Sequence, residues 1–200
     1  MSNFEEYKEL LFKATEDTDK AIYQAFLDSR NSTTKIIPQN IKSTYDLMQI
    51  SDNSKDMVEL KTRWKYTYEQ FDDISINLWK VRRLLELQQD AGANNIYFCI
   101  FYPKSDKVIL IDITHLEYDE SDVITRKTTF ETIADKNPKM MFNQMIELDI
   151  KNKVDNHKKT RTYKYIFPNL KEQYISTFLS YCNGYGIPQD VVDITLAQMS

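Results

Sequence analysis

The stretch DMVELKT, Asp56 to Thr62, alternates apolar and polar residues and decides how the rest of the chain is interpreted. A β-strand sends successive side chains to opposite faces of its sheet, so Val58 and Leu60 share one face while Glu59 and Lys61 share the other. The apolar face predicts contact with a core, and the polar face presents a carboxylate beside an ammonium. The stretch is therefore predicted to be a strand that carries a polar site.

Asp46 lies in the preceding β-like run, residues 45–50, which a polar turn at 51–55 joins to the quoted strand. Hairpin pairing of the two strands is expected to bring the carboxylates of Asp46 and Glu59 together. Adjacent carboxylates repel each other unless a cation neutralises them. A hard cation such as Mg²⁺, or Mn²⁺ as its substitute, accepts carboxylate, water and phosphate oxygens. Asp46 and Glu59 are therefore predicted to be metal ligands.

Lys61 has a predicted role beside the metal. Its ammonium can orient or help to deprotonate an attacking water, and it can stabilise the negative charge that grows on a phosphate in the transition state. The alternative is an ordinary surface ion pair, because isolated Glu-x-Lys tripeptides occur on surface strands by chance.

The surrounding pattern predicts an α/β fold in the order helix, three-strand meander, helix and two strands. The predicted elements are a helix at 3–29, strands near 36–38, 45–50 and 57–62, a helix from Phe71 to Gly92, and strands at 96–102 and 108–113. The second helix rests on apolar residues at helical spacing, namely Phe71, Ile74, Leu78, Val81 and Leu85. Beyond residue 114, strands are expected at 140–150 and 161–167, and helices at 170–182 and from Pro188.

These features resemble the PD-(D/E)XK nuclease superfamily, whose restriction-endonuclease-like core has this order of elements. The resemblance rests on Asp46, Glu59 and Lys61 and covers about residues 3–113. It departs at position 45, where the nominal proline of the family is Tyr45, a position that is not a ligand. The resemblance implies a Mg²⁺-dependent deoxyribonuclease, an endonuclease, in which Asp46, Glu59 and Lys61 are the catalytic residues.

The domain organisation expected from this resemblance is a nuclease core at residues 1–114 and a mixed α+β C-terminal elaboration at 115–200. The elaboration is expected to pack on the core, without folding independently, and to supply substrate contacts or the surface of a homodimer. Sequence-specific, structure-specific and exonucleolytic cleavage all fit the motif, and so does RNA as substrate. The alternative is a catalytically inactive DNA- or protein-binding module that retains the nuclease fold.

Further site residues are expected on the two predicted helices. In many members of the superfamily an acidic residue of the first helix extends the metal shell, and Glu9 and Glu16 are the candidates here, with Glu16 preferred. Lys80 and Arg83 share the side of the second helix that lies opposite its apolar stripe, so they are predicted to contact DNA phosphates. For all four residues the alternative is a solvated charged face.

A basic segment near the C-terminus is the second predicted DNA contact. Lys158, Lys159 and Arg161 lie in a run of six basic residues between positions 151 and 164, next to Tyr163 and Tyr165. Cations that neutralise phosphates and aromatic rings that stack on bases are typical of nucleic-acid-binding surfaces. A flexible polar hairpin is the alternative for this segment.

Composition limits the other function classes. The net charge is −4 and the isoelectric point is about 5.3, so a nucleic-acid partner is expected to meet a local patch and not a basic protein. Cys99 and Cys182 lie in apolar or aromatic runs and are expected to be free and buried. His115 and His157 have no second ligand at zinc-binding spacing. We expect a soluble cytoplasmic protein, because no uncharged stretch of 18 residues or signal peptide occurs.

Overall fold

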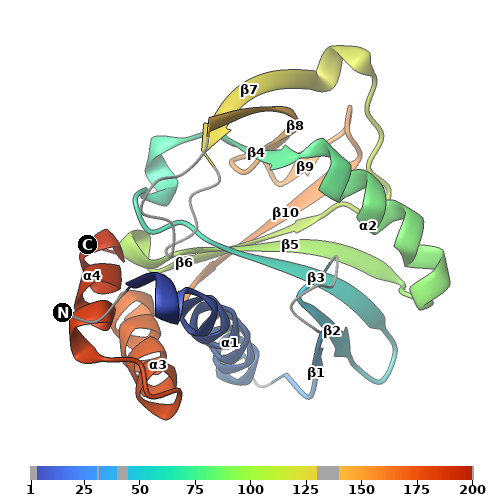
Figure 1. The fold of residues 1–200 in the computed structure, drawn as a ribbon. Coiled ribbons are helices and arrows are strands. Elements are labelled where there is room, and N and C mark those ends of the chain that lie inside the picture. The colour runs from blue at the N-terminus through green and yellow to red at the C-terminus, as the bar shows by residue number, and fades with distance from the viewer. Residues whose placement is uncertain (1–3, 31, 40–44, 130–139, 200) are drawn as a thin grey trace.

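The computed structural model describes residues 4–30, 32–39, 45–129 and 140–199. Within these ranges the chain forms a seven-stranded sheet, a three-stranded sheet and four α-helices (Figure 1). The mixed α/β class expected from the sequence is confirmed. None of the helices in the described ranges has the length and apolar character needed to cross a membrane.

The seven-stranded sheet contains the predicted meander and the two predicted strands that follow it. Its order is β1 (Lys35–Pro38), β2 (Leu47–Ile50), β3 (Lys55–Thr62), β5 (Asn95–Tyr102), β6 (Lys107–Asp112), β10 (Thr160–Ile166) and β9 (Val154–Asp155). All neighbouring strands pair antiparallel except β3 and β5, which are parallel. A parallel pair needs a crossover connection, and the chain between β3 and β5 supplies it with β4 and α2.

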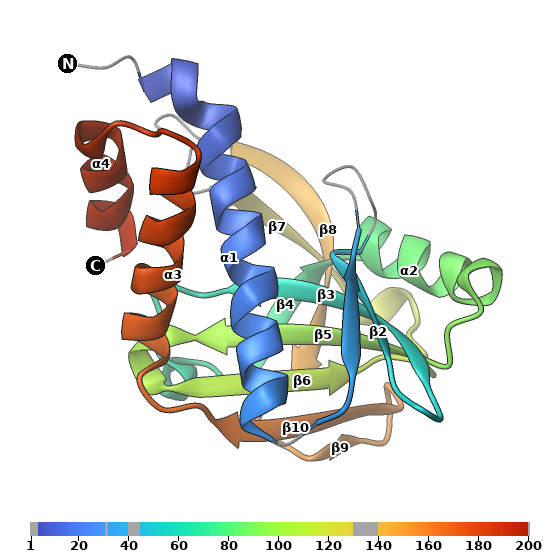
Figure 2. The same cartoon turned by 90° about the horizontal axis from the view of Figure 1, so that it is seen from below.

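Three helices cover one face of this sheet. They are α1 (Lys8–Ser29), preceded by the 3₁₀ turn Phe4–Tyr7, α3 (Leu170–Gly184) and α4 (Gln189–Met199), which lie together in two perpendicular views (Figures 1 and 2). Val58 and Leu60 of β3 face them and pack in one core cluster with Phe26 of α1 and Phe178 of α3. The predicted helix at 3–29 and the apolar face of β3 are confirmed.

The other face of the large sheet is covered by α2 (Leu78–Ala91) and the small sheet. The small sheet has the order β4 (Asp73–Asn77), β8 (Met140–Asp149) and β7 (Val123–Thr129). Phe98 and Ile100 of β5 pack against Ile76 of β4 and Ile146 of β8 in a second core cluster. Strand β5 is therefore buried on both faces, as its uninterrupted apolar sequence predicts.

The predicted start of the second helix at Phe71 is wrong, because residues 73–77 form β4 and α2 begins at Leu78. Ile74 and Ile76 alternate into the second core, and β4 pairs with β8, a strand some 70 residues later in the sequence. Ile74 and Ile76 are two residues apart, as in a strand, but Ile74 also belongs to the series of apolar residues at helical spacing. The predicted end is confirmed, since Gly92 has the left-handed φ of 60° at the C-cap.

The C-terminal part of the chain contributes to both sheets and to the helical layer. The strands and helices expected beyond residue 114 are confirmed as β8, β10, α3 and α4, while β7 was not predicted. Strand β10 pairs with β6 in the large sheet, and α3 packs against α1. The division of the chain at residue 114 stays a prediction.

Candidate active site

The predicted Asp46–Glu59–Lys61 site lies where β2 and β3 begin to separate. Leu47 pairs with Val58, so Asp46, one residue before β2, comes opposite Glu59. The Asp46 N–H donates to the Val58 carbonyl at 3.1 Å, and the Leu60 N–H donates to Asp46 Oδ2 at 2.6 Å. These two bonds fix the Asp46 carboxylate on β3, beside Glu59.

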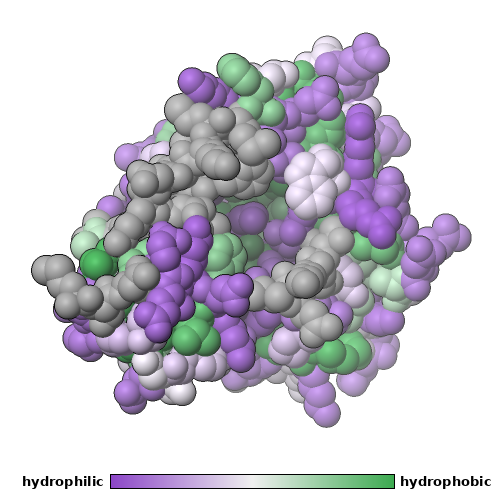
Figure 3. Space-filling model, viewed as in Figure 1, coloured by the Kyte–Doolittle hydropathy of each residue, from purple (hydrophilic) through white to green (hydrophobic). Residues whose placement is uncertain are grey.

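Strand β3 and the start of α2 lie at the face of the molecule shown in Figure 1. In the space-filling view this face is hollowed near its middle, between the small sheet above and the large sheet below, and hydrophilic side chains lie in the hollow (Figure 3). The polar side chains of the site come from elements that border this region.

Glu59 is the most enclosed of the predicted site residues, with 2% of its surface exposed. Its Oε1 lies 2.8 Å from the Nζ of Lys80 and 3.4 Å from the Nζ of Lys61. Its Oε2 is buried and has no hydrogen-bond partner among the described residues. Burial and the neighbouring charge of Asp46 raise the pKa of Glu59 to about 7, although the two lysines act in the opposite direction.

The two lysines differ in their freedom to move. The side chain of Lys61 is 51% exposed, so its ammonium can reach outward from the strand. Lys80, in the first turn of α2, is 18% exposed and points to Glu59 instead of solvent. Arg83, predicted to share a phosphate with Lys80, lies on the outer side of α2 and pairs with Glu86 at 3.2 Å. The predicted phosphate contacts of Lys80 and Arg83 stay predictions.

Helix α1 adds Glu16 to the neighbourhood of Asp46. Partial burial raises the pKa of Glu16, and the charge of Asp46 raises it further, whereas Lys20, whose Nζ lies 3.7 Å from Glu16 Oε2, lowers it. Glu9, the other candidate, is exposed two turns earlier on the helix. The carboxylate oxygens of Glu16, Asp46 and Glu59 do not all lie within 4.8 Å of one another, so Glu16 does not complete a closed triplet of ligands.

Asp19 is a fourth acid near the site that the sequence did not indicate. Its Oδ1 accepts hydrogen bonds from Thr62 Oγ1 at 2.7 Å and from Tyr174 Oη at 2.5 Å. Burial raises the pKa of Asp19 to about 6, and the charge of Asp46 contributes in the same direction. Because Tyr174 belongs to α3, only the folded structure shows this arrangement.

The donor set fits a hard divalent cation. Mg²⁺ in proteins is usually held by one or two carboxylates, with water and phosphate oxygens as its other ligands. Asp46 and Glu59 supply two carboxylates on one edge of β3, and the partnerless Glu59 Oε2 is a buried oxygen that such an ion would satisfy. A pair of carboxylates, extended by Glu16 through water, is therefore chemically suited to Mg²⁺ or Mn²⁺.

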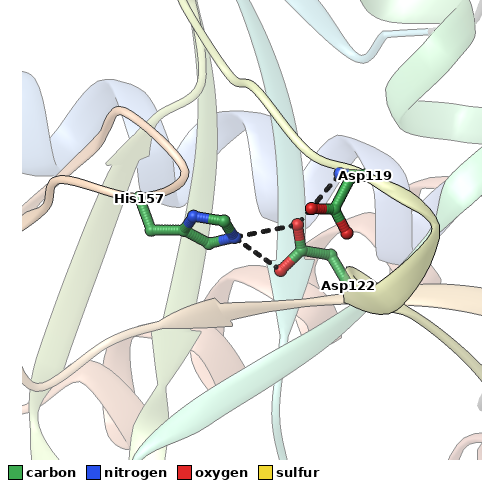
Figure 4. Close-up of side chains that lie close together, drawn as sticks. All are labelled: Asp119, Asp122 and His157. Carbon is green, nitrogen blue, oxygen red and sulfur yellow. Dashed lines mark hydrogen bonds and ion pairs between the residues drawn. The ribbon is translucent and has the colours of Figure 1, made fainter.

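A second acidic cluster lies elsewhere, on the 3₁₀ turn Glu120–Asp122 and the turn before β10 (Figure 4). His157 Nε2 lies 3.1 Å from Asp122 Oδ2, and Lys158 Nζ lies 3.1 Å from Asp122 Oδ1. Asp119 Oδ1 accepts the N–H of Ser121 at 2.7 Å as part of a capping box. Because Ser121 donates to Asp119, and His157 and Lys158 pair with Asp122, we interpret the cluster as a contact that holds the two turns together.

The predicted basic DNA contact is largely engaged in ion pairs within the protein. Lys158 pairs with Asp122, and Lys159 pairs with Glu117. Arg161 is exposed and lies opposite Asp112 in the β6–β10 register. A role of Lys158, Lys159 and Arg161 in DNA binding stays a prediction.

Comparisons with known proteins give little independent information. No family model matches the sequence, and no curated protein matches it. Among solved structures the chain is similar to Hjc, a Holliday junction resolvase from Archaeoglobus fulgidus, with 12% sequence identity and a TM-score of 0.41. The similarity covers 66% of this chain and 83% of that chain. At this level it carries no argument about function, so the site is interpreted from its own residues.

Proposed function

We propose that this chain is a divalent-metal-dependent nuclease with a restriction-endonuclease-like core, which cleaves DNA phosphodiester bonds as an endonuclease. The observation that carries the proposal is the surroundings of Glu59. This carboxylate is almost fully buried, both ammonium contacts fall on Oε1, and Oε2 has no partner among the described residues. Asp46, which precedes β2 and accepts the Leu60 N–H of β3, adds a second negative charge nearby.

A cation at this position would remove two unfavourable terms. A buried carboxylate oxygen without a partner costs free energy, and two neighbouring carboxylates repel each other. Glu59 and Asp46 would hold such an ion, which would offset both, and the two lysines could keep their contacts with Glu59 Oε1. The lysines therefore leave one oxygen of Glu59 available as a ligand.

The residues of the site divide into three roles. Asp46 and Glu59 would hold the ion, and Lys80 fixes the orientation of the Glu59 carboxylate through its contact with Oε1. When bound, Mg²⁺ or Mn²⁺ supplies Lewis-acid chemistry, which lowers the pKa of water and withdraws charge from phosphate oxygens. Lys61 is exposed enough to reach a phosphate oxygen or the attacking water, where its ammonium stabilises negative charge.

One observation favours the alternative, a binding module without catalysis. The ammonium of Lys80, 2.8 Å from Glu59, already provides a counter-charge within the protein. A lysine in this position can substitute for a metal in balancing the buried acid. The two proposals therefore differ in whether a divalent cation binds at all.

Binding of Mn²⁺, measured by calorimetry, separates them. We expect one site in the wild-type protein that is lost in Asp46→Asn and Glu59→Gln. Asp122→Asn is the matched control, because it removes a carboxylate from the other acidic cluster. Cleavage of duplex, branched and single-stranded DNA, and of RNA, is then followed in Mg²⁺. Absence of both Mn²⁺ binding and product on every substrate would leave the binding module as the function.

A further inference from the structure

Trp79 exposes a large aromatic surface next to the candidate active site. It lies in the first turn of α2, one residue before Lys80, whose Nζ contacts Glu59. Trp79 is 58% exposed, whereas Trp64, the other tryptophan, is 6% exposed and packs edge-on against Tyr174. An exposed tryptophan leaves a flat aromatic surface in water, which is suited to stack on a planar ligand.

The direction of Trp79 follows from helix geometry. Leu78, Val81 and Leu84 form the buried side of α2, and Lys80 flanks that side toward β3. Trp79 and Arg83 are four residues apart and share the outer side. Helical side chains also lean toward the N-terminus of their helix, so Trp79 inclines toward the end of α2 from which Lys80 reaches the site.

We propose that Trp79 is a stacking platform for an unpaired base of the bound strand, which makes single-stranded or branched nucleic acid the preferred substrate class. This inference rests on the proposed function. Inside a duplex the faces of the bases are covered by their neighbours, so an exposed indole can stack only on a base outside the duplex. Stacking on an aromatic side chain is tolerant of sequence, which suits recognition of a structure and not of a base order.

The charges around Trp79 suit a nucleic-acid strand. Arg83, on the same side of α2, is 53% exposed and, among the described residues, pairs with Glu86, itself 65% exposed, and such surface pairs are weak. A phosphate can therefore compete for the guanidinium. Lys61, half exposed on β3, offers a second ammonium beside the proposed metal site. A base on Trp79 would bring its strand close to Arg83, one helical turn away.

Tryptophan fluorescence tests the stacking without depending on cleavage. In Trp64→Phe, Trp79 is the single tryptophan, and the exchange removes no hydrogen bond because the Trp64 indole N–H has no partner among the described residues. In Ca²⁺, single-stranded DNA should quench the Trp79 emission strongly, the matching duplex should quench it weakly, and an abasic strand should quench it least. Binding of single-stranded DNA, followed by anisotropy of a label, with unchanged tryptophan emission would overturn the proposal.

Substitution of Trp79 provides the second arm. Trp79→Ala should weaken binding of single-stranded DNA by roughly 10-fold, which corresponds to the usual strength of stacking one base on an aromatic side chain. Trp79→Phe should restore part of this affinity, because phenylalanine still offers an aromatic face. Phe142→Ala is the matched control, since Phe142 is a 75% exposed aromatic residue on β8. Equal losses in the two alanine variants, or a changed oligomeric mass of Trp79→Ala with unchanged DNA affinity, would contradict stacking. Stacking without cleavage in Mg²⁺ would uphold the inference while refuting the nuclease.

Discussion

Replacing Glu59 with glutamine should make the metal-free protein less sensitive to alkaline pH. Glutamine keeps the shape of the side chain but carries no charge, so it mimics the protonated acid. The folded protein raises the pKa of Glu59 from the ordinary 4.5 to about 7, mainly through burial. It therefore holds this proton more tightly than the unfolded chain does. Stability is lost as the pH rises between these two values, and the loss is complete above the higher one.

The size of the effect follows from these two pKa values. Between about pH 6 and about pH 8.5, the wild-type protein should lose about 1.4 kcal/mol of unfolding free energy through this one group. The Glu59→Gln protein lacks this loss. The titration of Asp19, whose pKa is about 6, occurs in both proteins and cancels in their difference. Both pH values also lie above the isoelectric point of about 5.3. Close to the isoelectric point the low net charge would favour association of the protein.

Urea denaturation in chelator at the two pH values measures this difference. We expect the unfolding free energy of Glu59→Gln, relative to the wild type, to rise by about 1.4 kcal/mol from the lower to the higher pH. Asp122→Asn serves as the control, because Asp122 has a lowered pKa and a different location. If the difference in unfolding free energy between Glu59→Gln and the wild type stayed constant with pH, the pKa of Glu59 would not be raised in the folded protein. In that case the argument for a cation beside it would also fail.

Three further predictions concern the proposed site and the backbone. Lys61→Met should lower kcat in Mg²⁺ by at least ~100-fold while Mn²⁺ still binds, whereas Asp46→Asn should lose both cleavage and Mn²⁺ binding. A loss of Mn²⁺ affinity in Lys61→Met equal to that in Asp46→Asn would contradict the role of Lys61. Calcium should support DNA binding without cleavage, and gel shifts showing equally tight binding in chelator would refute this. Gly92→Ala should lower the unfolding free energy by about 1 kcal/mol because Gly92 has a φ of +60°. Gly184→Ala, where a Cβ meets nothing within 4 Å and φ is not positive, should show no such loss on denaturation.

The central motif could be predicted because a hairpin is a local structure. Alternation along residues 56–62 assigns the two faces of β3, and the short turn before it limits how Asp46 can pair. Strand β5 was recognisable for a similar reason, since only a strand covered on both faces has such a continuous apolar sequence. These inferences needed only neighbours in the sequence.

Other parts of the fold depend on partners that are distant in the sequence. Ile74 and Ile76 form a strand because β8 is available to pair with them, and no residue near β4 indicates that partner. The environment of Asp19 depends on Tyr174 in the same way. Helical periodicity places Lys80 opposite the apolar stripe with Arg83, whereas in the structure the Lys80 ammonium contacts the buried carboxylate of Glu59. Contacts between distant segments therefore decide these features.

The burial of Glu59 connects the fold to the proposed chemistry. The sequence predicts a polar face of β3, and β3 does carry one, but Glu59 is buried there at 2% exposure beside Lys80 of α2, while Lys61 remains half exposed. A buried acid with an incomplete set of partners lowers the stability of the fold, and such groups occur mainly at functional sites, where a ligand can complete the set. At Glu59 one oxygen, Oε2, has no partner among the described residues, the other pairs with two lysines, and the nearby charge of Asp46 repels the carboxylate. A divalent cation is the ligand that this charge arrangement accommodates best, and its binding should therefore be strongest at the pH where Glu59 is ionised.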